Sequence, residues 1–159
     1  MRIKVVVVGK LKEKYWKDAV KEYLKRLEAY AKVEIVEVDE ERLQDNPSSI
    51  EIEKALAKEE ERINRHISQS SFVIPLAIEG KMVSSQELSS FMGKLAVEGK
   101  SDIAFIIGSS HGISREIIRE GDCILSFSKM TFPHQMMRVI LLEQIYRAFK
   151  IMKGEPYHK

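Results

Sequence analysis

Short apolar segments without polar alternation are the feature that most limits the folds open to this chain. Ile3–Val8 is β-branched apart from Lys4, and Ile103–Ile107 is apolar throughout. Strands of this composition are typical of a parallel sheet that is covered on both faces. Phe72–Ile78 predicts a third buried strand, in which Pro75 indicates an edge or a bend on one side.

Helical patterns lie between these strands. Tyr15–Tyr30 places apolar residues at helical spacing, which predicts an amphipathic helix. Ser48 with Glu51, and Ser84 with Glu87, form capping boxes that would each begin a further helix. Because strands alternate with helices, we predict an α/β fold, with a mostly parallel sheet and helices on both faces.

The remaining elements are shorter or more exposed. Val33–Val38 alternates apolar residues with Glu, which predicts a more exposed strand. A short helical segment at Ser114–Arg119 precedes a strand at Cys123–Ser126. A last helix runs from Pro133 to about Met152, and Pro133 suits the first helical position because no N–H is needed there.

The composition fits one ordinary globular domain, residues 1–159. Hydrophobic residues make up 44% and charged residues 31% of the chain, which is typical of a domain with its own core. Cys123 is the only cysteine, which excludes an internal disulfide and fits a reducing compartment. Because no apolar run is long enough to cross a membrane and no signal peptide is recognisable, we expect a cytoplasmic protein. The histidines lack metal-ligand spacing, so no metal site is predicted; they are His66, His111, His134 and His158.

The charge of the chain is unevenly spread, although the formal net charge is only +2. Residues 1–30 and 129–159 are basic, whereas residues 40–62 are acidic. Two interpretations stay open. The chain has a phosphate-facing surface opposite an acidic one, or it has a solvated exterior of mixed charge.

Three segments that follow predicted buried strands are candidates for a binding site. They are residues 76–80, 108–112 and 127–132. In open α/β sheets, ligands bind in the crevice outside the carboxyl ends of the strands, so we expect these segments to converge. They would form a pocket with exposed backbone N–H and C=O groups, and with Phe127 and Phe132 as apolar walls.

Two chemistries for this pocket can be weighed from the residues alone. A dinucleotide site would need a glycine-rich turn after the first strand, but no second glycine follows Gly9 closely. A serine hydrolase fits better, since residues 108–112 read G-x-S-x-G with Ser110 at the nucleophile position. Asp122 and His134 follow in the expected order, although the pattern is short and permissive.

The last helix begins with two candidates for acid–base chemistry. His134 and Arg138 are four residues apart, so they share one face of the first turns. An imidazole has a suitable unperturbed pKa, about 6.5, for a general base. A guanidinium could hold a phosphate or a developing anionic carbonyl oxygen. We therefore expect both side chains to look out beside the loop, and a well-capped helix start is the alternative.

Both ends of the chain resemble a known family. Residues 126–138 read S-F-S-K-M-T-F-P-H-Q-M-M-R and continue through a helix to a final P-Y-H-K, while residues 5–16 read V-V-V-V-G-K-L-K-E-K-Y-W. These segments and the total length are similar to the bacterial large-subunit (23S) ribosomal RNA pseudouridine N3-methyltransferases of the SPOUT superfamily. The resemblance covers essentially the whole chain and is highly specific.

This resemblance implies a fold, a cofactor and a reaction. The expected fold carries a C-terminal trefoil knot, and the expected methyl donor is S-adenosylmethionine. The expected reaction is methylation of N3 of a pseudouridine in 23S ribosomal RNA, in the assembled ribosome, with His134 and Arg138 as catalytic candidates. A non-catalytic protein that binds or assembles ribosomes is the alternative. Carried over by position, the donor pocket would consist of Leu76, Gly108, Phe127, Ser128, Lys129, Met130, Thr131 and Phe132.

One segment departs from the family pattern. The family often has G-G-x-x-G where residues 108–112 of this chain read G-S-S-H-G, so Ser109 takes the place of the second glycine. A side chain restricts φ at that position, which makes the path of this loop less predictable.

The end of the chain predicts two kinds of partner. Apolar residues wrap around more of the last helix than one core-facing stripe requires, which predicts a homodimer or, alternatively, a helix buried within one subunit. After Gly154, the tail ends in an aromatic ring, an imidazole and a cation, which can stack on a base and meet a phosphate. We predict that the tail closes over the donor pocket and that RNA is bound by Arg138, Tyr157, His158 and Lys159.

Overall fold

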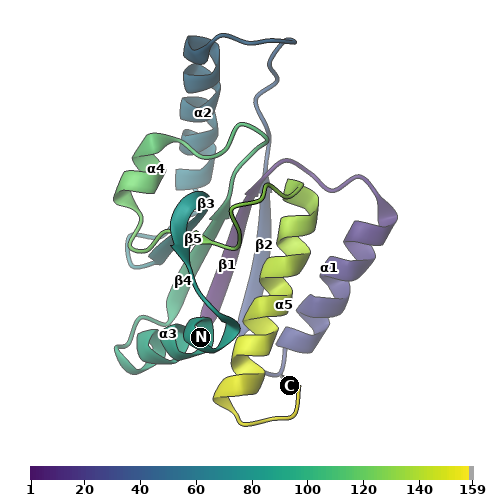
Figure 1. The fold of residues 1–159 in the computed structure, drawn as a ribbon, viewed down its shortest axis with the longest axis vertical. Helices are drawn as coiled ribbons and strands as arrows, with labels where there is room; N and C mark the ends of the chain where they lie inside the picture. Colours follow the sequence, from purple (N-terminus) through teal and green to yellow (C-terminus); the bar gives the residue numbers. More distant parts are fainter. Residues whose placement is uncertain (158–159) are drawn as a thin grey trace.

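Helices and strands alternate along the chain, as the apolar pattern predicts (Figure 1). A computed structural model describes residues 1–157. The elements are β1 (Arg2–Val8), α1 (Lys14–Leu27), β2 (Lys32–Val38), α2 (Ser49–Asn64), β3 (Phe72–Met82), α3 (Ser85–Val97), β4 (Asp102–Ile107), α4 (Arg115–Glu120), β5 (Leu125–Ser126) and α5 (His134–Met152). Within residues 1–157, no helix is long and apolar enough to cross a membrane.

The strands form one five-stranded sheet in the order β2-β1-β4-β3-β5. All of these neighbouring strands pair in parallel. β1 and β4 are interior strands with buried side chains on both faces, which explains their apolar runs. β2 lies at an edge, which accounts for its alternating pattern. The predicted fold class is therefore confirmed, whereas the trefoil knot stays a prediction.

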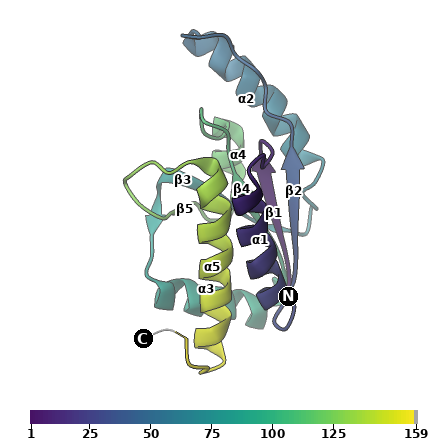
Figure 2. The same ribbon diagram turned by 90° about the vertical axis from the view of Figure 1, so that its right-hand side faces the viewer.

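Helices cover both faces of the sheet (Figures 1 and 2). Successive residues of β1 point to opposite faces, so one strand serves two cores. Ile3 and Val5 belong to the core under α1, α3 and α5. Val6 belongs to a second core with Ile63 of α2 and Ile117 of α4.

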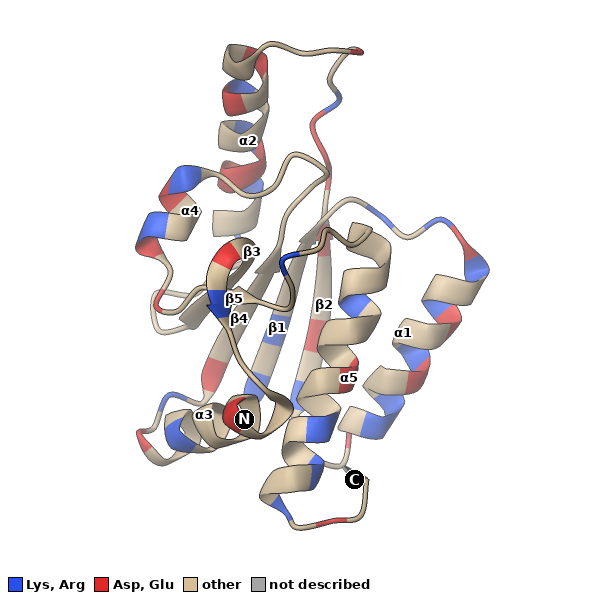
Figure 3. Cartoon of the chain, viewed as in Figure 1, with Lys and Arg blue, Asp and Glu red and all other residues tan. Residues whose placement is uncertain are grey.

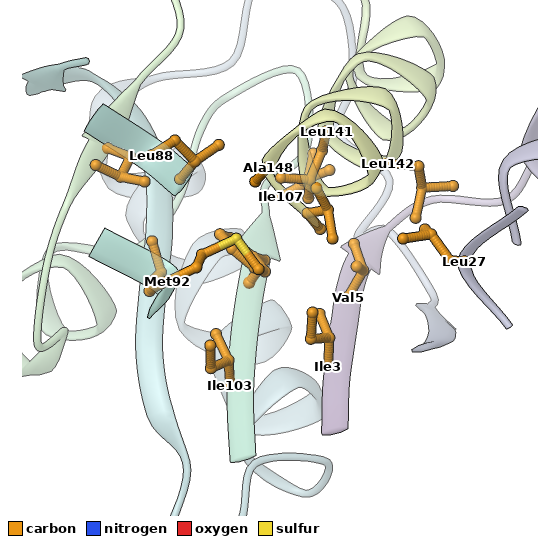
Figure 4. Packing of buried hydrophobic residues seen from close by; sticks show 14 of the residues in the cluster. Ile3, Val5, Leu27, Leu88, Met92, Ile103, Ile107, Leu141, Leu142 and Ala148 are labelled. Atoms are coloured by element: carbon orange, nitrogen blue, oxygen red, sulfur yellow. The ribbon is translucent and has the colours of Figure 1, made fainter. Parts of the chain in front are cut away.

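α5 is the central helix of the larger core. It packs against α1 and against α3. Leu141, Leu142 and Ala148 are fully buried, and Figure 4 shows them over the ends of β1 and β4. One face of α5 is thus buried within the subunit, and the helix is fixed from its first turns to its last.

β3 is longer than predicted and changes partner along its length. Residues 72–76 pair with β4, after which the register shifts and the end of the strand pairs with β5. Gly80 permits this, because a Cβ at that position would lie only 2.6 Å from the carbonyl carbon of Leu125. The strand therefore continues to Met82 instead of ending at Ile78.

Two prolines occupy special positions. Pro75 pairs opposite Ile106 of β4, and pairing with β5 begins only at Leu76, which agrees with the predicted edge on one side. Pro133 has an extended ψ of 136° and is the N-cap of α5, not its first helical residue. Its carbonyl accepts the N–H of Met137 at 3.0 Å, which is the role of an N-cap backbone.

Local patterns located the other helices well. Both predicted capping boxes are present, at the starts of α2 and α3. α1 ends earlier than predicted, because the N–H groups of Tyr30 and Ala31 both donate to the carbonyl of Leu27 and form a turn. β5 is shorter than the predicted Cys123–Ser126 strand, because the N–H groups of Asp122 and Cys123 both donate to the carbonyl of Val73 and do not continue the regular ladder.

Candidate functional site

A cavity of about 730 Å³ lies beside residues 76–79 of β3 and at the carboxyl ends of β4 and β5. Its volume is in the range of small-molecule sites. The three segments that were expected to converge do line it together. Among the predicted donor residues, the lining contains Leu76, Gly108, Phe127, Ser128, Met130, Thr131 and Phe132, whereas Lys129 does not line it.

The wall of this cavity combines apolar side chains with backbone groups. Leu76 of β3 and Ile107 at the end of β4 line it, as do Phe127 and Phe132 of the loop before α5. Met130 is 72% exposed, so it lies toward the solvent. A flat, partly apolar ligand with hydrogen-bonding edges would fit such a wall.

The loop of residues 108–112 is held in a tight turn. Ser109 and Gly112 exchange backbone hydrogen bonds of 3.1 and 2.9 Å. A Cβ on Gly108 would lie 2.1 Å from the carbonyl oxygen of Gly112, so only glycine fits there. Ser109 does not need this freedom, because its φ is not positive. Among the described non-glycine residues, only Asn46 has a positive φ. The serine that departs from the family pattern is therefore compatible with this backbone.

His134 lies at the boundary between this cavity and a second one. The second cavity, about 980 Å³, is formed mainly by residues 9–13 and 39–47. The two linings share Ser110, His111 and His134. The first cavity thus faces apolar strand ends, while the second faces charged loops, as the colours around the ends of β1 and β2 in Figure 3 show.

The surroundings of His134 favour the neutral form of its imidazole. Its Nε2 lies 3.2 Å from the position that a Cβ on Gly9 would take, and a carboxylate oxygen of Glu40 lies 3.7 Å from the same point. Burial lowers the pKa of His134, the positive charge of Arg138 lowers it further, and Glu40 opposes both. An imidazole of this kind can accept a proton at neutral pH.

Arg138 does not look out beside the loop, as its helical spacing from His134 had led us to expect. Its side chain is fully buried. The guanidinium donates to a carboxylate oxygen of Glu37 and, at 2.8 Å, to the carbonyl of Gly9. The same Glu37 oxygen accepts the N–H of Leu11 at 3.0 Å. Arg138 therefore fixes the loop behind His134, and in this arrangement it is closed off from RNA.

The parts of a serine hydrolase are not brought together. The hydroxyl of Ser110 donates to Glu40 at 3.4 Å. The carboxylate of Asp122 accepts the N–H of Val73, in the first half of β3, at 2.7 Å. Because each group is held by a different partner, the arrangement does not support a catalytic triad with His134.

The described part of the tail does not close over the cavity of its own chain. The hydroxyl of Tyr157 donates to Glu143 at 3.2 Å, and the Tyr157 ring packs against Tyr146 at 4.9 Å between centroids. Burial and the charge of Glu143 raise the pKa of Tyr157 to about 12. Since Glu143 follows His134 by nine residues, this contact lies roughly 13 Å along the helix from His134. His158 and Lys159, which were predicted with Tyr157, lie outside the described residues.

The side chains described here do not form a metal centre. Within residues 1–157, no group of three or more His, Cys, Asp or Glu side chains is placed to hold a metal ion.

The buried pair of Arg138 and Glu37 generates the first prediction. Replacing Arg138 by Ala should lower the free energy of unfolding by on the order of 3 kcal/mol, because the charge of Glu37 is left without its partner. Urea denaturation measures this loss. The control is Asp18→Ala, which breaks the exposed pair with Lys14 and should leave stability nearly unchanged. Equal effects from both changes would contradict a structural role for the buried pair.

Known proteins resemble this chain over its whole length. The family described as "Predicted SPOUT methyltransferase" matches residues 1–158. A Clostridium kluyveri protein, "Ribosomal RNA large subunit methyltransferase H", is 55% identical over 159 residues, which is 100% of both chains. A protein from Methanococcus maripaludis is 55% identical over the same extent. A solved structure described as a probable methylase family protein from Haemophilus influenzae Rd KW20 shares the fold, with a TM-score of 0.54 and 14% identity over 99% of this chain and 70% of that one. The chain belongs to the SPOUT methyltransferase family.

Proposed function

We propose that this protein transfers a methyl group from S-adenosylmethionine to N3 of a pseudouridine in 23S ribosomal RNA, within assembled ribosomes in the cytoplasm. The observation that carries the proposal is the cavity beside residues 76–79 of β3 and the ends of β4 and β5, whose lining contains the predicted donor residues except Lys129. The name of the Clostridium kluyveri relative supports large-subunit ribosomal RNA as the substrate class.

The residues of the cavity fit the proposed donor. Phe127 and Phe132 offer apolar surfaces for a purine ring, and residues 108–112 bring backbone N–H and C=O groups that suit its edge and a ribose. When bound, S-adenosylmethionine supplies an electrophilic methyl group on its sulfonium sulfur. The tight turn at Gly108 keeps the wall in place without the donor, so little ordering is required on binding.

His134 is the candidate general base of the reaction. A ring nitrogen must lose its proton when it takes up a methyl group, and a neutral imidazole can accept that proton. His134 lines both cavities, so the target base would approach it from the second cavity while the donor occupies the first. Arg138, which is buried behind this residue, takes a positioning role in place of the predicted contact with RNA.

Donor binding and nucleotide mapping test the function. Titration calorimetry should show binding of S-adenosylmethionine, because the cavity has the volume and lining of a small-molecule site. Ribosomes treated with the purified protein should then gain a methyl group on N3 of one pseudouridine of 23S RNA. A titration that shows no binding at millimolar S-adenosylmethionine would reject the methyltransferase proposal. It would favour the alternative, a non-catalytic protein that binds ribosomes.

The pH dependence of turnover tests the role of His134. The pKa of His134 lies below its usual value, mainly because of burial. A base works when it is unprotonated, so kcat should fall only as the pH drops below about 6.5 and should be level above it. His134→Asn should lower kcat at least about 100-fold and remove the acidic limb of the profile. Wild-type turnover in this variant, or a limb that lies well above pH 6.5, would remove His134 from the chemistry.

We also propose a homodimer in which one subunit's basic surface presents RNA to the cavity of the other. Along α5, Met136, Ile140 and Ile151 stay only half-buried in one chain, although the opposite face is fully packed. A second copy could cover them. Because Tyr157 contacts Glu143 in the middle of α5, away from its own cavity, the tail would act on RNA away from that cavity or at the partner's.

Light scattering and a short truncation test this assembly. The mass in solution should be twice the 18.3 kDa of one chain. Ending the chain after Pro156 removes Tyr157, His158 and Lys159 but leaves the contacts of Glu155 with Tyr30 and Lys150. The truncated protein should keep the dimer and donor binding but lose most methylation of ribosomes. A monomeric mass would contradict the dimer, and unchanged methylation would show that the tail is dispensable.

A further inference from the structure

A buried acid on α2 lies between the walls of the two cavities. Glu59 is only 3% exposed, and Ser109, its neighbour across the gap, is 8% exposed. Burial raises the pKa of Glu59. A carboxyl group in such a place costs free energy unless its oxygens are well bonded, so its hydrogen bonds indicate why it is there.

Both carboxylate oxygens of Glu59 are bonded, and each holds a different segment. Oε2 accepts the hydroxyl of Ser109 at 3.0 Å, which fixes the 108–112 loop that lines the first cavity. Oε1 accepts the N–H of Glu41 at 2.9 Å, which fixes the 39–47 segment that lines the second cavity. One side chain thus sets the distance between the two walls.

Ion pairs around Glu41 strengthen the second of these contacts. The carboxylate of Glu41 pairs with Lys58 at 2.7 Å and with Arg62 at 2.6 Å, and both cations lie on α2. Arg62 also donates to the carbonyl of Asp39 at 2.8 Å. The start of the 39–47 segment is therefore attached to α2 on both sides of Glu59. Figure 2 shows α2 and this segment running together beyond the end of the sheet.

We propose that Glu59 is a positioning residue that holds the donor-binding loop, through Ser109, at a fixed separation from the 39–47 segment. This inference rests on the proposed function, since it assigns the first cavity to S-adenosylmethionine. Glu59 contacts neither ligand and acts through Ser109. The hydroxyl of Ser109 is the link that makes this possible.

Three variants and a control separate positioning from folding. Glu59→Gln can keep both bonds, because the amide oxygen accepts the N–H of Glu41 while the amide NH₂ donates to the Ser109 oxygen. Glu59→Ala loses both bonds, and Ser109→Ala loses one and leaves a buried oxygen unsatisfied. Glu61→Ala removes an exposed acid from the same helix and is the matched control.

Calorimetric titration with S-adenosylmethionine gives the decisive numbers, with urea unfolding measured on the same preparations. Relative to wild type, the dissociation constant should rise about tenfold for Glu59→Ala and about fivefold for Ser109→Ala. It should stay within about twofold for Glu59→Gln and be unchanged for Glu61→Ala. If the negative charge of Glu59 were required, Glu59→Gln would bind the donor weakly. Near wild-type affinity in this variant would therefore show that the two hydrogen bonds are what matters.

The outcomes separate this inference from the proposed function. Absence of donor binding by the wild-type protein would reject the function itself. If the wild type binds the donor, unchanged affinity in Glu59→Ala overturns the inference, and so does an equal loss in Glu59→Gln. Lower stability with unchanged affinity shows a purely structural role and also overturns it. If Glu59→Ala fails to fold, Ser109→Ala decides the question, because it keeps the bond to Glu41.

Discussion

The buried guanidinium of Arg138 is the interaction on which the functional end of the molecule depends. Taking this charge out of water is costly, and the cost is offset by Glu37 at the end of β2 and by the carbonyl of Gly9 after β1. Its Nε has no hydrogen-bond partner, so the geometry is fixed by the two terminal nitrogens. The bonds join the second turn of α5 to the ends of two strands. His134, one turn earlier on the same helix, is thereby held against Gly9.

The cavity opens where the sheet stops being regular. β3 leaves β4 after Leu76 and joins β5 at its far end, so a gap forms between the strand ends. Close backbone approaches fix the rim of this gap: Gly80 lies against Leu125, and Gly108 lies against Gly112. The crevice outside the carboxyl ends of a parallel sheet is a common ligand site because loops there are free to vary while the strands below stay rigid. In this protein, the close backbone approaches at Gly80 and Gly108 hold the segments beyond the strand pairing in place as well.

Sequence patterns predicted the features that depend on residues close together in the chain. The apolar runs located β1 and β4, the capping boxes located α2 and α3, and the order of elements predicted the convergence of the three loops. The direction of Arg138 could not be predicted, because a spacing of four residues shows that two side chains share a helix face but not which way that face points. Glu59 was missed because its partner, Ser109, is fifty residues away in sequence. The contact of Tyr157 with Glu143 required knowing how the chain turns after α5.

The charges around the second cavity limit what it can accept. Asp39 is paired with Lys10 at 2.7 Å, and Glu41 is paired with two cations of α2, so much of the charge in this wall is already neutralised within the chain. Glu40 remains beside the imidazole of His134. A phosphate placed there would meet a carboxylate, whereas the N–H edge of a nucleobase would find an acceptor. The part of the cavity beside Glu40 therefore suits a nucleobase rather than a phosphate. Lys12 and Arg42 also line this cavity, so phosphates of the proposed RNA substrate would be met at these cations rather than beside Glu40.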